Sequence, residues 1–337
     1  MTLSTPTQNE SRTERQESLR VLNLVTNDSS QFYNHQIETL EAQGISSTTL
    51  SVPGENKSES TESTGTGKRS PLDYLRFIPE VLAETSSSYD ILHANYGLTA
   101  PAALIQRELP VVLSLWGSDL MGRYGWMTRR CVPHVDALIV MSERMAAAVD
   151  RDCYVIPHGV NLERFEPQPQ LEAQSELEWD PQVKHVVFPY PSKRDVKDFP
   201  KAKRVFETAA ARYGGSVELH TITGVAHSDM PTYMNAADAL LLTSRREGSP
   251  NTVKEALACN LPVVATNFGD VPERLDGVTH STVGESDSEL AAGLVAALEA
   301  DERSNGRDYA EELGLDRMGE RIADVYRDVL SDTRATR

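Results

Sequence analysis

Cysteine is scarce in this sequence, and the few that occur form no pattern. The chain has three, Cys131, Cys153 and Cys259, an odd number without the close spacing of metal ligands. Disulfide frameworks are typical of small secreted domains, so this count favours a reducing compartment and thiols that lie in the core. We therefore expect neither a disulfide framework nor a zinc framework.

Long hydrophobic runs are also missing. No stretch reaches the ~18 consecutive apolar residues that a transmembrane helix needs, and the first twenty residues contain no apolar stretch typical of a signal peptide. We expect a soluble, cytoplasmic protein whose residues 1–19 form a disordered extension.

Basic residues are in the minority. The chain has 33 Lys and Arg against 50 Asp and Glu, a net charge of −17 that is spread along its length. This charge disfavours nucleic-acid binding. Diffuse acidity suits a protein that works in concentrated salt, where self-repulsion is screened. A halophilic source is one prediction, and an ordinarily acidic cytosolic enzyme is the alternative.

The length of 337 residues favours two domains, because single cores rarely grow so large. Short apolar strands alternate with helical patterns in both halves, which is typical of doubly wound parallel sheets. We predict a first domain at 20–165 with a flexible Ser/Thr/Gly/Glu-rich loop at 54–70, a linker at 166–184 and a second domain at 185–313.

One stretch, 237–270, contains the clearest β-loop-α-β unit. A buried strand at 239–242 leads into a loop at 244–249, Pro250 can begin a helix, and Asn260 can end it in a left-handed conformation. A second buried strand follows at 263–266. The loop therefore lies at the carboxyl end of its strand, the edge where open α/β sheets bind ligands.

Two carboxylates frame this unit, Glu247 in the loop and Glu255 in the helix. Between them, a segment of small residues and free backbone N–H groups at a helix N-terminus is a ready site for phosphate; it comprises Gly248, Ser249, Pro250, Asn251 and Thr252. Carboxylates accept hydrogen bonds from diols, so the layout fits a nucleotide sugar. The alternative is that both glutamates are ordinary solvated charges.

Two cations follow the first strand of the second domain. Arg194 and Lys197 come just after the strand at 186–188 and before a helical pattern that begins near Pro200. Paired cations at such a place can neutralise a diphosphate leaving group. Lys193 remains a rival to Lys197, and surface solvation is the alternative for all of them.

The segments EGSP at 247–250, KEA at 254–256 and LPVVA at 261–265 resemble the donor-site signature of retaining glycosyltransferases of family 4, the glycosyl transferases group 1. This resemblance implies the GT-B fold, in which two Rossmann-like doubly wound α/β domains face a central cleft. It implies a hexosyltransferase-like enzyme, with Glu247 beside the transferred sugar, Glu255 at the ribose and His227 bordering the base. A final helix at 314–331 is expected to pack back on the first domain.

The resemblance also indicates an acceptor side. His93 and Asp119 lie in HAN at 93–95 and WGSD at 116–119, which are similar to the family's acceptor-side segments, so both are candidate catalytic residues. By itself His93 fits a buried structural histidine better than a catalytic one. The loop at 27–30 lacks the glycine pair that family members usually carry there, so no acceptor or phosphate contact is assigned to it.

A basic and aromatic segment at 121–131 stands out in this acidic chain; it contains Arg123, Tyr124, Trp126, Arg129 and Arg130. Such a segment can hold an anionic acceptor or contact a membrane surface, which predicts peripheral association at the inner face of the cell membrane. The alternative is a solvated arginine face beside a packed tryptophan.

The predicted function is transfer of a sugar from a UDP- or GDP-linked donor to a glycan or lipid-linked acceptor. The cations and the helix N-terminus answer the charge on the leaving diphosphate, so we expect neither a metal nor a cofactor. Retention is implied by the resemblance alone, since no nucleophilic carboxylate can be assigned. The alternatives are a sugar-nucleotide epimerase or phosphorylase of GT-B shape, or a non-catalytic nucleotide-sugar-binding partner.

Overall fold

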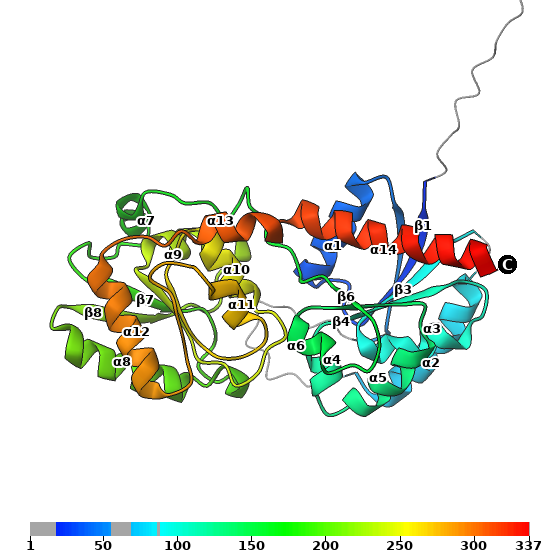
Figure 1. Cartoon of the computed structure of the whole chain (residues 1–337), viewed down its shortest axis with the longest axis horizontal. Coiled ribbons are helices and arrows are strands. Elements are labelled where there is room, and N and C mark those ends of the chain that lie inside the picture. The colour runs from blue at the N-terminus through cyan, green and yellow to red at the C-terminus, as the bar shows by residue number, and fades with distance from the viewer. Residues whose placement is uncertain (1–17, 55–68, 86–87, 337) are drawn as a thin grey trace, which may run out of the picture.

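The computed structural model describes residues 18–54, 69–85 and 88–336, which form two α/β lobes lying side by side (Figure 1). The predicted extension at 1–19 and flexible loop at 54–70 fall almost entirely outside these residues. The first lobe contains a parallel sheet in the order β2-β1-β3-β4-β5-β6. Its strands are β1 (Arg20–Val25), β2 (Ser46–Ser51), β3 (Ile91–Asn95), β4 (Val111–Leu115), β5 (Ala137–Val140) and β6 (Tyr154–Val155).

Helices cover both faces of this sheet because its strands are apolar on both sides. Those of the first lobe are α1 (Gln31–Ala42), α2 (Pro71–Glu84), α3 (Ala100–Ile105), α4 (Ser118–Met121), α5 (Gly125–Cys131) and α6 (Glu143–Ala146). The strands β3, β4 and β5 are buried along their whole length. The free thiol of Cys131 is buried here, whereas Cys153 is partly exposed.

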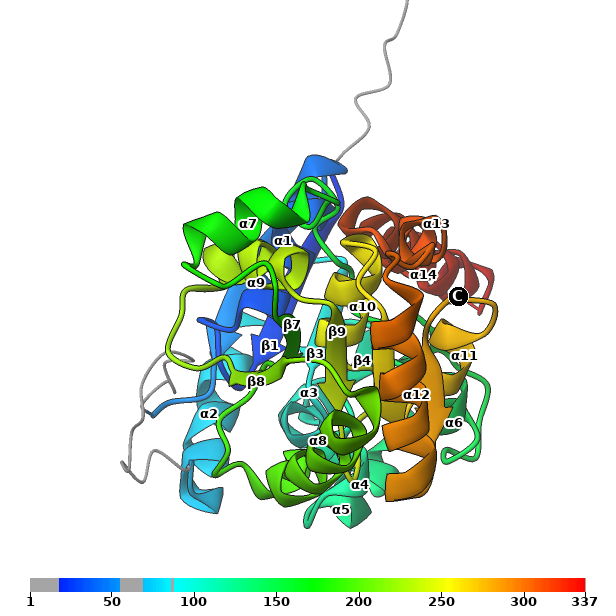
Figure 2. The same ribbon diagram turned by 90° about the vertical axis from the view of Figure 1, so that its left-hand side faces the viewer.

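The second lobe contains a parallel sheet in the order β11-β10-β9-β7-β8. Its strands are β7 (Lys184–Phe188), β8 (Val217–Thr221), β9 (Ala239–Leu242), β10 (Val263–Thr266) and β11 (Thr282–Gly284). One face packs on α8 (Phe199–Tyr213) and α12 (Asp287–Ala300), and the other on α9 (Met230–Ala236), α10 (Asn251–Ala258), α11 (Val271–Leu275) and α13 (Gly306–Ala310) (Figure 2). These two parallel-sheet domains confirm the predicted doubly wound α/β fold class.

The segment 166–184, expected to be a linker, contains the helix α7 (Gln170–Glu176). Ala173 and Gln174 are buried, and the Gln174 side-chain amide donates to the carbonyl of Ala236 at the end of α9 (3.0 Å). The polar composition of this segment therefore conceals a helix that packs on the second lobe.

The last helix, α14 (Leu315–Thr336), returns to the first lobe (Figure 1). Its apolar residues belong to the same hydrophobic core as β1 and β3; they are Met318, Ile322, Ala323, Val325, Tyr326 and Val329. The first described strand and the last helix thus lie on the same lobe. The second lobe is formed by the sequence between these two parts of the first. No helix in the described part of the chain is both long enough and apolar enough to cross a membrane.

Each sheet has one switch point, where the strand order reverses. In the first sheet it lies between β1 and β3, and in the second between β7 and β9. Open α/β sheets bind ligands in the crevice beyond the carboxyl ends of the strands at such a point. The loops after β7 and β9 are therefore the first place to look for a site.

Candidate active site

The loops after β7 and β9 bring the predicted donor residues together. Arg194 and Lys197 follow β7, and Glu247 follows β9, so they flank the switch point of the second sheet. Lys197 Nζ forms an ion pair with Glu247 Oε1. This contact joins two loops that lie fifty residues apart in sequence and fixes both side chains at the carboxyl edge of the sheet.

Lys197 is the cation that the fold builds into this site. It is only 2% exposed, and its Nζ lies 3.4 Å from the centroid of the Tyr190 ring. Burial lowers the pKa of Lys197 to about 8, although the neighbouring Glu247 carboxylate opposes this shift. A negative phosphate placed beside this desolvated ammonium would stabilise its charged form.

Arg194 is exposed, and its guanidinium lies 5.7 Å from the same Tyr190 ring. Lys193 is also exposed, and it forms no ion pair with any residue in the described part of the chain. The structure therefore distinguishes the two lysines: Lys197 lies in the crevice with Glu247, and Lys193 lies on the surface.

The helix α10 begins at this crevice. Its N-cap residue is Pro250, which has an extended conformation. A proline is tolerated at the start of a helix because its missing N–H is not needed there. The Thr252 hydroxyl lies 2.6 Å from Tyr190 Oη. The side-chain oxygen of Asn251 is buried and accepts no hydrogen bond from any described residue, so an acceptor atom at the helix start is left for a ligand or a water. The Ser249 hydroxyl donates to Asp270 (2.7 Å).

Glu255 lies one turn further along α10 and is buried. Its Oε1 lies 2.7 Å from His227 Nε2, and His227 Nδ1 lies 2.8 Å from the amide nitrogen of Gln31 on the first lobe. Since an amide nitrogen only donates, His227 Nδ1 is the acceptor of that hydrogen bond. His227 Nε2 therefore carries the proton and donates a hydrogen bond to the Glu255 carboxylate. Glu255 and His227 therefore lie together, as the donor-site assignment requires, and they link the two lobes.

The backbones of the two lobes lie close together at a pair of glycines. Gly117 adopts a φ of +113°, and a Cβ at this position would lie 3.4 Å from Gly248 Cα and N. On the other side, a Cβ on Gly248 would lie 3.1 Å from Met145 Sδ. The two backbones are therefore close at the crevice, a side chain at Gly248 would make its neighbours shift by a few tenths of an ångström, and the φ of Gly117 disfavours any residue with a Cβ.

Asp119 supports this contact without facing the crevice. Its carboxylate is 2% exposed and accepts from the backbone N–H groups of Gly97 (2.8 Å), Trp116 (3.0 Å) and Gly117 (2.8 Å). Burial raises the pKa of Asp119, although the three N–H donors oppose this. Asp119 therefore holds the loop that carries Gly117, and the catalytic role expected for it stays a prediction.

The catalytic role expected for His93 also stays a prediction, and the structure places this side chain in the core of the first lobe. His93 is completely buried, with Nδ1 2.6 Å from Tyr326 Oη on α14 and Nε2 2.8 Å from Ser114 Oγ on β4. Burial lowers the pKa of His93 to about 3, so the ring is neutral at pH 7. His93 lies two residues before the end of β3 and ties the last helix to the first sheet, away from the crevice.

Sequence reasoning missed the aromatic wall that the first lobe presents. His158 is sandwiched between Phe32 (5.5 Å between ring centroids) and Trp116 (5.0 Å), and its carbonyl accepts from the buried Lys254 Nζ (2.6 Å). Tyr96 follows β3 with a φ of +137°, a conformation that costs a non-glycine residue about 1–3 kcal/mol. Such strain gathers at functional sites.

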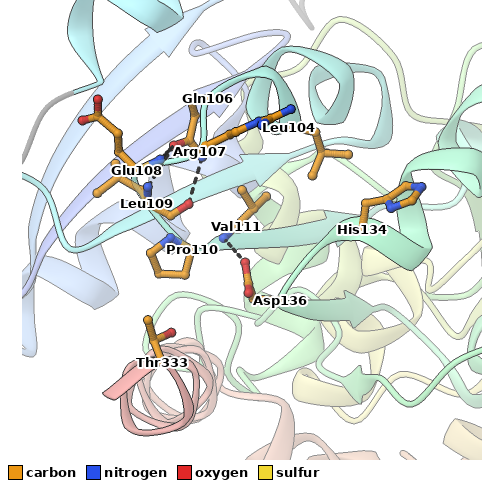
Figure 3. A pocket seen from close by; sticks show the side chains of 10 residues that line it. All are labelled: Leu104, Gln106, Arg107, Glu108, Leu109, Pro110, Val111, His134, Asp136 and Thr333. Carbon is orange, nitrogen blue, oxygen red and sulfur yellow. Dashed lines mark hydrogen bonds between the residues drawn. The ribbon is translucent and has the colours of Figure 1, made fainter. Parts of the chain in front are cut away.

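A separate hollow in the first lobe lies at the opposite edge of the sheet. It is bordered by Leu109, Val111 and Asp136 and by Thr333 of α14 (Figure 3). Two of its polar side chains bond within the lobe: Asp136 accepts from Val111 N (2.7 Å), and Gln106 donates to the carbonyl of Leu109 (2.9 Å). Val111 is the first residue of β4, so this hollow lies at the amino ends of the strands and is not part of the candidate site.

Two doubly wound domains facing one crevice define the GT-B class, and comparison with solved structures confirms it. Sucrose-phosphate synthase from Thermosynechococcus elongatus superposes with a TM-score of 0.71 at 15% identity, covering 93% of this chain and 100% of that one. HepE of Anabaena, solved in complex with UDP, superposes with a TM-score of 0.61 at 16% identity, covering 92% and 100%. At these identities the likeness shows the fold.

Family models match both domains. The model described as Glycosyltransferase Family 4 matches residues 35–164, and that described as Glycosyl transferases group 1 matches residues 198–300. The chain belongs to the glycosyl transferases group 1, as the donor-site signature predicts.

Curated relatives are more similar in sequence than these solved structures, but the matches span only part of each chain. TuaC of Bacillus subtilis, assigned as a teichuronic acid biosynthesis glycosyltransferase, is 25% identical over 240 residues, 62% of this chain and 61% of that protein. A lipopolysaccharide core mannosyltransferase, LpsB of Rhizobium meliloti, is 27% identical over 210 residues, 54% and 60% of the two chains. The match thus spans about three fifths of each of these relatives.

Proposed function

We propose that this protein transfers a sugar from a nucleotide-sugar donor to a glycan or lipid-linked acceptor. The observation that carries this proposal is the arrangement at the β7/β9 switch point, where Lys197, Glu247, Glu255 and the start of α10 converge. In this placement the diphosphate lies against Lys197, Arg194 and the N-terminus of α10. Glu247 faces the transferred sugar and Glu255 the ribose.

The chemistry needs most help at the leaving group, because negative charge grows on the diphosphate as the anomeric carbon becomes cationic. Lys197, Arg194 and the α10 N–H groups are placed to stabilise that charge, and one such donor is worth about 3–4 kcal/mol in comparable sites. Three donors of this kind supply the role that a divalent ion has elsewhere. We therefore propose transfer that does not require a metal in the reaction.

Retention of anomeric configuration is also part of the proposal. Back-side attack needs a base that activates the acceptor hydroxyl. Both candidate bases of the first lobe are committed, His93 to Tyr326 and Ser114, and Asp119 to three backbone N–H groups. Departure and attack on the same face, with the leaving phosphate oxygen accepting the proton, needs neither residue.

The acceptor class is proposed from the relatives and from one surface segment. The names of TuaC, LpsB and a GDP-mannose-dependent phosphatidylinositol monomannoside mannosyltransferase of Mycolicibacterium smegmatis describe polymer or lipid-linked glycans. On α5, Trp126 is 60% exposed with Arg130 5.7 Å from its ring centroid. An exposed tryptophan beside arginine favours peripheral contact with an anionic membrane. A halophilic source remains part of the proposal, supported by the net charge of −17.

The test is a transfer assay with labelled UDP-sugars and GDP-sugars and a mixed lipid and glycan extract, with and without chelator. We expect label in a product of the extract, chelator-resistant transfer, and a kcat lowered roughly a hundredfold or more in Arg194→Ala. Lys193→Ala, a neighbouring exposed cation, is the matched control and should keep its kcat. Epimer formation, or binding without turnover, would contradict the proposal in favour of an epimerase or a binding partner.

A further inference from the structure

A cluster of possible metal ligands lies on the edge of the second sheet, away from the donor crevice. His185 is the second residue of β7, and Glu218 and His220 lie on the neighbouring edge strand β8. In the parallel register His185 pairs with Glu218 and Val187 with His220. Paired residues of parallel strands, and residues two apart along one strand, share a face. All three side chains therefore lie on one face of the sheet.

Their ligand atoms converge. The three atoms all lie within 4.8 Å of one another, with His185 Nδ1 2.9 Å from His220 Nε2 and His220 Nε2 3.8 Å from Glu218 Oε2. Ligands that bind one zinc ion at about 2.0–2.1 Å in a tetrahedron lie about 3.3–3.4 Å apart. The two distances straddle that value, so an ion needs only small side-chain movements to enter.

Hydrogen bonding prepares His185 as a ligand. Its Nε2 lies 3.0 Å from the carbonyl oxygen of Asp180, and a carbonyl only accepts, so Nε2 carries the proton. The lone pair of Nδ1 is therefore directed at the cluster. A ring N–H donated to a carbonyl is the usual support of a metal-binding histidine, because it fixes the tautomer and raises ligand basicity.

Trp179 fixes the other imidazole. Its ring stacks on His220 with 3.9 Å between centroids and 15° between planes, and lies 4.6 Å from His185. Glu218, by contrast, has a side chain that is 62% exposed. The two histidines are thus held in place, and the carboxylate side is open for an ion to enter and for water to take a fourth position.

The surroundings do not compete for the site. Lys184, next to His185 in sequence, is paired with Asp238 and Asp301. Two imidazoles and one carboxylate favour zinc-class ions over magnesium or calcium, which prefer all-oxygen sites. Tyr190 of the donor crevice lies beyond the opposite end of β7, roughly 15 Å away along the strand. An ion here cannot contact the donor diphosphate.

We propose that His185, Glu218 and His220 bind one divalent ion of the zinc class. Such an ion fastens the edge strand β8 to β7, and holds the Trp179 segment that follows α7 over them. The site is structural and independent of the proposed transfer reaction.

Calorimetric titration of zinc chloride into chelator-treated, tag-free full-length protein tests this. We expect one ion per chain, with affinity lowered at least about tenfold in His220→Gln and in Glu218→Gln. The matched control is His280→Gln, since His280 lies on the same domain with a single carboxylate, Glu302, 3.5 Å away. That variant should bind zinc like the wild type.

A second readout uses Trp179. Copper(II) bound at His220 should quench its fluorescence in the wild type, and the quenching should be lost in His220→Gln. Equal zinc affinity in wild type, His220→Gln and Glu218→Gln, or no stoichiometric binding at all, would overturn the proposal. Nucleoside diphosphate binding, measured on the same samples, should be unchanged in all variants, so failure here is separate from failure of the transferase proposal.

Discussion

Raising the pH above 8 is expected to weaken donor binding through Lys197. Burial lowers the pKa of this ammonium to about 8 in the ligand-free protein, while an adjacent diphosphate raises it again in the complex. The donor therefore selects the protonated form. The sign follows from this: affinity is constant well below pH 8 and falls as the pH rises through 8, because a proton must first be bound.

The size of the effect follows from the protonated fraction. With a pKa of about 8, that fraction falls from about nine tenths at pH 7 to about one tenth at pH 9, so the apparent Kd should rise about tenfold. Binding at pH 9 should take up close to one proton. A nucleotide sugar is the right probe, since its diphosphate is esterified at both ends and lacks the phosphate proton that titrates near ~6.

Calorimetry in buffers of different ionisation enthalpy measures both quantities. Lys197→Arg should bind with a Kd that hardly depends on pH, because guanidinium stays charged throughout. Lys254, whose pKa is also lowered to about 8 by burial, is the competing source of such behaviour. If the Kd of Lys197→Arg keeps the full pH dependence, Lys197 is not the group whose protonation is coupled to diphosphate binding.

Three further predictions concern the rest of the molecule. Tyr326→Phe removes the hydroxyl that pairs with buried His93, so the free energy of unfolding measured in urea should fall by about 1–3 kcal/mol while kcat is unchanged. A lowered kcat at full stability would support a catalytic role for His93. Thermal unfolding should shift upward from low to molar potassium chloride, as the charge of −17 requires for a halophilic protein, and an unchanged Tm would contradict that source. Wild-type protein should co-sediment with anionic liposomes, and Trp126→Ala should do so to a smaller extent. Leu171→Ala, which removes another exposed apolar side chain, is the control; equal binding by all three proteins would contradict the membrane contact.

Local patterns predict the donor unit well because its structure is local. The strands β9 and β10 have the predicted bounds, and Asn260 adopts the left-handed conformation expected after α10, with a φ of +55°. By contrast, β11 is three residues long and only partly buried, so it lacks the apolar run that marks a strand. The helix α7 is stabilised by packing on α9, which its polar composition does not show.

Side-chain partners from distant segments could not be predicted. The tyrosine that binds His93 lies 233 residues away along the chain, so the sequence around His93 gives no sign of this partner. Similarly, the spacing of Glu218 and His220 indicates one face of a strand, but only the sheet order places His185 beside them. Glu247 and Glu255 could be proposed because a long motif carries them, and Arg194 because it follows a strand that its apolar run predicts.

The central claim is that the β7/β9 crevice holds a nucleotide-sugar donor, with Glu255 at the ribose and Glu247 at the sugar. Glu255 is a buried residue of α10 and contacts His227, whereas Glu247 lies in the loop after β9 and forms an ion pair with Lys197. A contact with a part of the donor that does not react contributes equally to ground and transition states, so it is seen in affinity. A contact with the reacting sugar is seen in kcat.

The most direct measurement is calorimetric titration of a nucleoside diphosphate, which lacks the sugar, into four proteins at pH 7. Glu255→Gln should lose about ten- to a hundredfold in affinity, the worth of a charged hydrogen bond. Glu247→Gln should keep its affinity within a few fold while its kcat falls, and Glu273→Gln, an exposed glutamate on α11, should match the wild type. Loss of affinity in Glu247→Gln with retention in Glu255→Gln would reverse the donor in the crevice, and no loss in either would place the nucleotide elsewhere.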